Sequence, residues 1–127
     1  MPLARIDLAA GHSAAYRKAI ADGVHRALTE TFTVPADDRF QVITEHTPGG
    51  DLIYDPQYLG IQRSDGFVLI QLTVSNTRTI EQKKALYRRI AELLKDNPGV
   101  RPEDVFINLV EVAKENWSFG NGIAQYA

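Results

Sequence analysis

The sequence predicts an α+β fold in which two βαβ units share a four-stranded mixed sheet, with both helices on one face. Three observations predict this fold. The second half of the chain repeats the polarity pattern of the first at an offset of 66 residues, each half contains one apolar stripe of helical period, and each helical stretch lies between two strand-like stretches. Because a strand, a helix and a parallel strand form a right-handed unit, two such units joined edge to edge have the order βαββαβ.

The internal repeat is clearest where VPADDRFQVITE, Val34–Glu45, aligns with VRPEDVFINLVE, Val100–Glu111. The identical residues at equivalent positions are Val34 and Val100, Asp38 and Asp104, Phe40 and Phe106, and Glu45 and Glu111. The alignment continues without a gap to the beginning of the chain, and apolar residues stay opposite apolar ones. It predicts repeat units at about residues 2–46 and 67–112 and a C-terminal tail at residues 113–127, within one domain that spans residues 1–127.

The first unit is expected to begin with a strand at Pro2–Leu8, since a strand tolerates proline as its first residue. Ser13 is a suitable N-cap for the helix that follows, in which apolar residues recur at every fourth position. These apolar residues are Tyr16, Ile20, Val24 and Leu28, and the small residues Ala19, Gly23 and Ala27 allow a neighbouring element to approach closely. A second strand at Phe40–Thr44 completes the unit.

The second unit follows a long irregular connection that is rich in glycine and proline, between residues 47 and 66. Its first strand is expected at Phe67–Val74, which has the β-branched and aromatic content of a buried strand. Thr79 and Gln82 have the spacing of a capping box, which predicts a helix start. The apolar stripe of this helix is Leu86, Ile90 and Leu94. The closing strand is expected at Val105–Val112.

Composition and charge exclude several classes of function. Fourteen basic and sixteen acidic residues give a net charge of -2 without a long run of one sign, so we expect neither a nucleic acid nor a membrane surface as partner. The chain has no cysteine, its three histidines are scattered, and it has no glycine-rich phosphate loop, so we predict no disulfide, metal site or nucleotide cofactor. Without a signal peptide or a membrane-length apolar run, a cytoplasmic protein is expected.

The face of the sheet opposite the helices is expected to be covered by self-association. In the third predicted strand, Val68, Ile70 and Leu72 alternate with Leu69, Gln71 and Thr73, so neither side of the strand is wholly polar. An apolar sheet face left in water favours association with another copy. We therefore predict an oligomer.

Four stretches of the sequence resemble the tautomerase superfamily, and most of all its malonate semialdehyde decarboxylase-like branch. They are the Met-Pro start, VPADDRF, SNTRTIEQKK and the tail sequence NWSFG, and the similarity covers essentially the whole chain. The resemblance implies the βαββαβ fold, a homotrimer, no cofactor, and a catalytic proline that becomes the amino terminus when Met1 is removed. It also implies catalytic roles at Pro2, Asp38 and Arg78.

The chemistry of these three residues is consistent with the implied roles. A free prolyl nitrogen is a rigid secondary amine, and both desolvation and a neighbouring cation lower the pKa of an amine, which makes it a better general base near neutral pH. Arg78 is the expected cation and carboxylate ligand, and Asp38 is expected to orient water or the amine. Trp117 and Phe119 match the aromatic tail that closes the pocket in the resembled branch.

One position departs from the pattern of that branch. The decarboxylase-like sequences carry two arginines separated by one residue, and at the first of these positions this chain has Asn76, a further candidate for substrate binding. A single arginine anchors a carboxylate but supplies less positive charge for loss of carbon dioxide. We therefore favour keto-enol isomerisation of a small 2-oxo acid. The alternatives are a decarboxylase or hydratase of a 3-oxo acid such as malonate semialdehyde, and a non-catalytic, ferredoxin-like oligomer that binds a small ligand.

Each candidate residue can also be explained by a purely structural role, without catalysis or substrate binding. Pro2 is an acceptable strand start, Asp38 is an acceptable turn cap because the second unit carries an aspartate at the same place, and Arg78 suits a solvated helix start. Trp117 and Phe119 are typical core or interface aromatics. Arg63 is a further candidate for contact with an anion, but its spacing in the sequence does not locate it relative to the other site residues.

Overall fold

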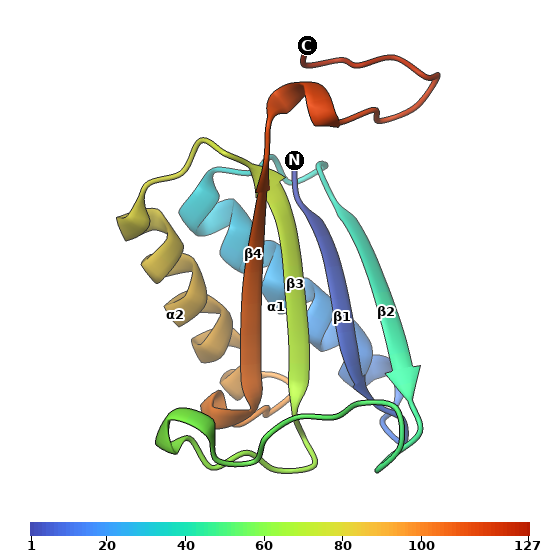
Figure 1. Cartoon of the computed structure of the whole chain (residues 1–127), viewed down its shortest axis with the longest axis vertical. Helices are drawn as coiled ribbons and strands as arrows, with labels where there is room; N and C mark the ends of the chain where they lie inside the picture. Colours follow the sequence, from blue (N-terminus) through green and yellow to red (C-terminus); the bar gives the residue numbers. More distant parts are fainter.

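The computed structural model describes all residues from Met1 to Ala127. The elements follow in the order β1 (Leu3–Ala9), α1 (Ala14–Phe32), β2 (Phe40–His46), β3 (Val68–Ser75), α2 (Ile80–Asp96) and β4 (Val105–Val112). Short 3-10 turns occur at Tyr58–Gly60, Pro102–Asp104 and Lys114–Asn116. The predicted βαββαβ order is confirmed (Figure 1).

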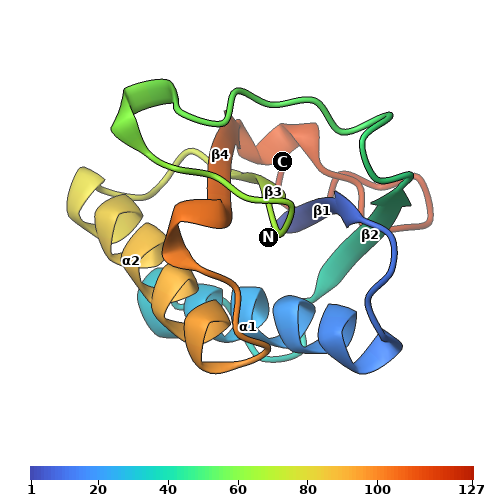
Figure 2. The ribbon, with the colours of Figure 1, turned by 90° about the horizontal axis from the view of Figure 1, so that it is seen from below.

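The four strands form one mixed sheet in the order β2-β1-β3-β4. The pairs β1–β2 and β3–β4 are parallel, whereas the central pair β1–β3 is antiparallel. Figure 2 shows both helices on one side of this sheet. β1 begins at Leu3 and not at Pro2, because proline has no N–H to donate to the ladder. β2 extends to His46, two residues beyond the expected end.

The core lies between the sheet and the two helices. Both predicted helical stripes are buried, apart from the partly exposed Tyr16. Ser13 caps α1 by accepting from the Tyr16 amide, and Thr79 and Gln82 form the expected capping box of α2. A Cβ atom added to Gly23 would lie 2.8 Å from Cδ2 of Leu94, so this glycine permits the close packing of α1 on α2. None of the helices has the length and apolar character needed to cross a membrane.

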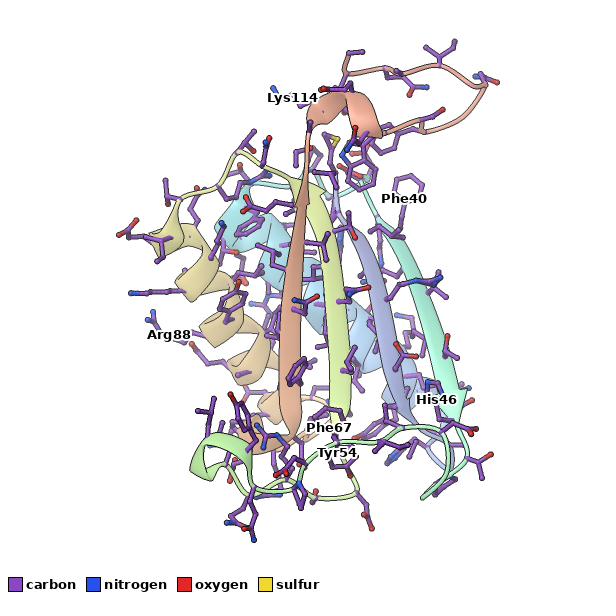
Figure 3. All side chains as sticks on the ribbon, viewed as in Figure 1. Phe40, His46, Tyr54, Phe67, Arg88 and Lys114 are labelled. Carbon is purple, nitrogen blue, oxygen red and sulfur yellow. The ribbon has the colours of Figure 1, made fainter.

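The other face of the sheet is uncovered in the single chain. Phe40 and Val42 of β2 and Phe106 and Val110 of β4 are between 37% and 50% exposed there. Figure 3 shows the Phe40 side chain at the upper end of this face. This is the surface from which self-association was predicted.

The two repeat units are related by an approximate twofold axis between β1 and β3. In the antiparallel register, Ala4 pairs with Leu72 and Ile6 pairs with Ile70. Ala4 is the repeat equivalent of Ile70, and Ile6 is that of Leu72, so a twofold rotation exchanges the two pairs. The sheet therefore has two edges, at opposite ends of its strands, that are built in the same way. One contains the chain start and the C-terminal tail, and the other contains the link, residues 47–66, as Figure 1 shows.

Candidate active site

Strand direction brings the start of the chain and the tail to the same edge of the sheet. Leu3 pairs with Phe40 at the start of β2 and with Thr73 near the end of β3, and Ser75 pairs with Val112 at the end of β4. This edge is at the top of Figure 1, where the amino terminus lies below the tail. The segments carrying Pro2, Asp38, Arg78 and Trp117 all leave the sheet here.

Pro2 and Asp38 are neighbours at this edge. Pro2 is buried, and the terminal ammonium group of Met1 forms an ion pair with the carboxylate of Asp38. The Asp38 side chain is 17% exposed, so the pair is only partly accessible to water. Only two atoms separate the Met1 nitrogen from the Pro2 nitrogen, which places the carboxylate within about 6 Å of the ring nitrogen.

The equivalent aspartate of the second unit has a different environment. Asp104 is 2% exposed and accepts hydrogen bonds from the Ser64 amide at 2.7 Å and the Ser64 hydroxyl at 2.6 Å. Asp104 therefore anchors the link. No side chain or backbone amide donates to Asp38 in the same way, and its carboxylate faces the chain start.

Arg78 lies just after β3, against the end of α1. Its Nη1 donates to the Thr77 hydroxyl at 2.7 Å, and its Nη2 donates to the carbonyl of Phe32 at 2.8 Å. The guanidinium carbon lies 5.0 Å from the centre of the Phe32 ring, and partial burial lowers the pKa of Arg78. The group remains a cation because an arginine titrates far above neutral pH. It makes no hydrogen bond to Pro2 or Asp38, and two of its five N–H donors are in use.

An aromatic wall flanks Pro2 at this edge. The rings of Trp117 and Phe119 are stacked with centroids 5.5 Å apart, and Phe119 lies 6.1 Å from Phe40. Together with Pro2 they line a cavity of about 210 Å³, whose other lining residues are Leu3 and Ser118. The cavity is small and mostly apolar. It suits the carbon skeleton of a compact substrate.

Three hydrogen bonds order the tail beside this cavity, and one of them joins it to the sheet. The indole Nε1 of Trp117 donates to the hydroxyl of Ser75 at 3.2 Å, and Ser75 is 1% exposed. Farther along, the Phe119 amide donates to the Gln125 side chain at 3.0 Å, and that side chain donates in turn to the Gly120 carbonyl at 3.1 Å. The tail is thus attached to β3 and folded on itself.

Sequence reasoning missed Phe40 and Ser75 at this site. Phe40 lies in VPADDRF and follows Asp38 by two positions, so its proximity to that residue was a usable signal. No local pattern marks Ser75, because its partner is 42 positions away. Asn76 is exposed at the same edge, and only its backbone amide is bonded, to the Val112 carbonyl at 3.0 Å.

Arg63 lies at the opposite edge. Its Nη1 donates to the backbone carbonyls of Asp55, Tyr58 and Ile61 within the link, at 3.0 to 3.3 Å. It therefore makes no contact with the cavity beside Pro2.

Comparison with known proteins decides the family. Two family models, both described as tautomerase enzymes, match residues 38–120 and residues 2–58. The chain belongs to the tautomerase family. Among curated tautomerase relatives, it is 44% identical to the probable tautomerase YusQ of Bacillus subtilis (strain 168), over 98% of each chain. It is 36% identical to the probable tautomerase YrdN of the same strain, over 99% of this chain and 96% of that protein.

Solved structures place this tautomerase in the malonate semialdehyde decarboxylase-like branch. The FG41 malonate semialdehyde decarboxylase inhibited by 3-bromopropiolate has a TM-score of 0.90 and 46% identity, with 98% of this chain and 93% of that chain covered. A second malonate semialdehyde decarboxylase, described as having decarboxylase and hydratase activities, has a TM-score of 0.90 and 36% identity, with 98% and 95% covered. The expected family resemblance is confirmed. The chain is an enzyme, not the non-catalytic ligand-binding oligomer that was the alternative.

Proposed function

We propose that this protein is a cofactor-independent tautomerase of a small 2-oxo acid, in which the amino-terminal nitrogen of Pro2 is the general acid and base. The observation that carries this proposal is the position of Pro2, which follows the residue that pairs with Asp38 and lines an apolar cavity walled by Trp117 and Phe119. A base beside a compact apolar cavity is the arrangement that proton transfer on a small carbonyl compound requires.

The proposal requires removal of Met1. While Met1 is attached, the Pro2 nitrogen belongs to a peptide bond and accepts no proton. Removal of Met1 creates a secondary amine at Pro2 and takes away the ammonium group that now pairs with Asp38. The carboxylate then becomes available to the new amine or to a water molecule beside it.

The proton transfer is a two-stage exchange. The Pro2 amine removes the enol O–H proton of the substrate, the electron pair closes the carbonyl, and the protonated amine returns a proton to the adjacent carbon. The reverse sequence converts keto to enol, and no atom is lost.

Arg78 is the proposed anchor for the substrate carboxylate. Three of its five N–H donors are free of protein partners, which leaves enough for a bidentate contact. Its hydrogen bond to the Phe32 carbonyl holds the guanidinium at the carboxyl end of α1, where the helix dipole also favours a cation. Asn76, exposed at the same edge, is proposed to contact the second polar group of the substrate.

A second candidate reaction is decarboxylation or hydration of a 3-oxo acid such as malonate semialdehyde. The 46% identity to a malonate semialdehyde decarboxylase over almost the whole chain favours it. Asn76, in place of a second arginine, weakens it because the site has less positive charge to hold the departing carboxylate.

The proposed assembly is a homotrimer in the cytoplasm. The uncovered sheet face, with Val42 and Val110 exposed outside the two cavities, is the surface that assembly would bury. Two structures of the same fold, at 19% and 16% identity and a TM-score of 0.79 each, are described as symmetric trimers of fused 4-OT.

The experiment has two parts. Intact mass of the purified protein is expected to show the loss of Met1. An absorbance assay with an enolisable 2-oxo acid is then expected to show that Pro2→Ala lowers kcat/KM by about 100-fold or more, the range of general acid-base catalysis. Pro48→Ala, in the exposed link, is the matched control and should retain full activity. Equal rates for wild type and Pro2→Ala would overturn the proposal, and a parallel assay with malonate semialdehyde separates the second candidate.

A further inference from the structure

The edge of the sheet opposite Pro2 carries a second cavity of similar size. Its volume is about 230 Å³, against about 210 Å³ for the cavity at Pro2. Leu69 and Phe106 line it, and they are the repeat equivalents of Leu3 and Phe40, which line the first. The approximate twofold axis of the fold therefore generates a pocket at each edge from the same strand positions.

Aromatic residues cover both cavities, but they come from different segments. At the second edge the link supplies Tyr54, whose ring stacks on Phe67 with centroids 4.1 Å apart, and Phe67 lies 5.9 Å from Phe106. Figure 3 shows Tyr54 and Phe67 together at the lower end of the sheet. The Tyr54 hydroxyl donates to the Ser64 carbonyl at 2.7 Å. Ser64 is itself held by Asp104, so the wall is fixed before any ligand arrives.

The second cavity lacks the catalytic group. Val68 occupies the position equivalent to Pro2, and its nitrogen is in the middle of the chain. Asp104, the equivalent of Asp38, is committed to Ser64. A molecule in this cavity would bind without being converted.

Arg63 gives the cavity a cation. The residue lines the cavity together with Tyr54, Tyr58 and Asp55. Its Nη1 alone makes the three bonds to link carbonyls, so Nε and Nη2 have no protein acceptor. Asp55 is the only carboxylate in the lining, and one of its oxygens accepts a hydrogen bond from the Gln57 amide at 2.7 Å. Aromatic walls with one partly free guanidinium suit a flat molecule that carries a carboxylate.

We propose that the cavity formed by the link, Phe67, Leu69 and Phe106 is a second, non-catalytic binding site for a small planar carboxylate, with Arg63 as its anion contact. This site is separate from the active site at Pro2. Its ligand has the same charged group as the proposed substrate, which would let a substrate or product molecule occupy both edges of one subunit.

The test is a nuclear magnetic resonance titration of the purified, assembled protein with benzoate, and with benzamide as the neutral probe of the same shape. Benzoate is expected to shift the amide signals of Phe67, Leu69 and Phe106. The indole signal of Trp117, the only tryptophan, reports separately on the cavity at Pro2. Benzoate should bind the second cavity about tenfold more tightly than benzamide, because a charge-assisted hydrogen bond is stronger than a neutral one.

Three variants test the role of the lining. Arg63→Gln is expected to reduce benzoate binding about tenfold and to leave benzamide binding unchanged. Tyr58→Ala, which removes a 65% exposed ring without a side-chain hydrogen bond, should weaken both probes. Arg88→Gln, on the outer surface of α2, is the matched control and should change neither. If Arg63→Gln loses both probes because the link collapses, Arg63→Lys must restore the preference for benzoate, or the proposal fails.

The remaining outcomes are decisive. Shifts confined to the Trp117 edge, equal affinity for the two probes, or no shift because a second copy covers the cavity would each overturn the second site. The result does not depend on the proposed reaction. If Pro2→Ala kept full activity while the Phe67 and Phe106 signals still moved with benzoate, the proposed function would fail and the second site would stand.

Discussion

The indole nitrogen of Trp117 donates a hydrogen bond to the Ser75 hydroxyl at 3.2 Å and so ties the C-terminal tail to the end of β3. Ser75 is 1% exposed, and its repeat equivalent in β1 is Ala9, which has no hydroxyl. The serine therefore belongs to the edge that carries Pro2 and the tail. Its position makes it the residue that orients the aromatic wall beside Pro2, at the proposed active site.

Ser75→Ala is expected to loosen that wall without unfolding the protein. Loss of one neutral hydrogen bond lowers the free energy of unfolding by about 1 kcal/mol. The KM for substrate should rise several-fold while kcat changes less, because the wall encloses the substrate and does not move the proton. The fluorescence of Trp117 should shift to longer wavelength as the indole gains contact with water. Ser75→Thr, which retains the hydroxyl, should behave like the wild type in fluorescence, and a mutant spectrum identical to that of wild type would contradict this role.

Substitution by asparagine is expected to lower mainly the stability of the protein at Asp104 and mainly its activity at Asp38. Asp104→Asn removes a buried carboxylate that accepts two hydrogen bonds from Ser64, so the free energy of unfolding should fall by about 2 kcal/mol. Asp38→Asn should cost little stability but lower activity. Thermal denaturation and steady-state kinetics of the two variants, measured together, check the contrast. A larger loss of stability in Asp38→Asn than in Asp104→Asn would contradict it.

Asp38 should also set the pH dependence of the reaction. A carboxylate near an amine favours the protonated amine and raises its pKa. Its loss in Asp38→Asn should therefore lower the pKa of the Pro2 amine, and the acid limb of the kcat/KM profile should move to lower pH. The measurement is a pH-rate profile of the protein from which Met1 has been removed. An unmoved acid limb would show that Asp38 acts only on water or on the substrate.

Arg78→Gln is expected to raise KM for a carboxylated substrate by about tenfold or more, since a hydrogen bond to a charged group is worth about 1.5 to 3 kcal/mol. Arg78→Lys keeps the charge but not the planar fork and should recover only part of the affinity. Arg78→Gln loses the contact with the Phe32 carbonyl, so the thermal stability of both variants serves as the control. If the lysine variant bound substrate as well as wild type, bidentate recognition would be ruled out.

Gly23→Ala is expected to destabilise the packing of α1 on α2. Alanine in a helix is favoured over glycine by about 1 kcal/mol, but the new Cβ would lie 2.8 Å from a methyl group of Leu94. Leu94 is 0% exposed and has little room to move, so overpacking, which costs about 1 to 3 kcal/mol, should outweigh the helix gain. Chemical denaturation measures the net sign. Gly23→Ser should be worse than alanine.

Local patterns in the sequence were enough to predict the secondary structure and the topology. The Ser13 cap, the Thr79–Gln82 capping box and the stripes containing Val24 and Ile90 are all short-range features, because they depend on residues three or four positions apart. The 66-residue repeat then predicted the strand directions. In the structure, the strand register brings the segments that carry Pro2, Asp38 and Arg78 to one edge of the sheet.

The contacts made at that edge were decided only by the tertiary structure. The sequence by itself determined the fold, the family resemblance and the candidate residues, since these follow from periodicity and from stretches such as VPADDRF. It did not determine that Ser75 holds Trp117, that Arg78 bonds to the Phe32 carbonyl, or that Asp104 holds Ser64 while Asp38 faces the chain start. The partners in these contacts are 37 to 46 positions apart. They meet only because four strands assemble into one sheet, and no local pattern encodes which side chains that assembly brings together.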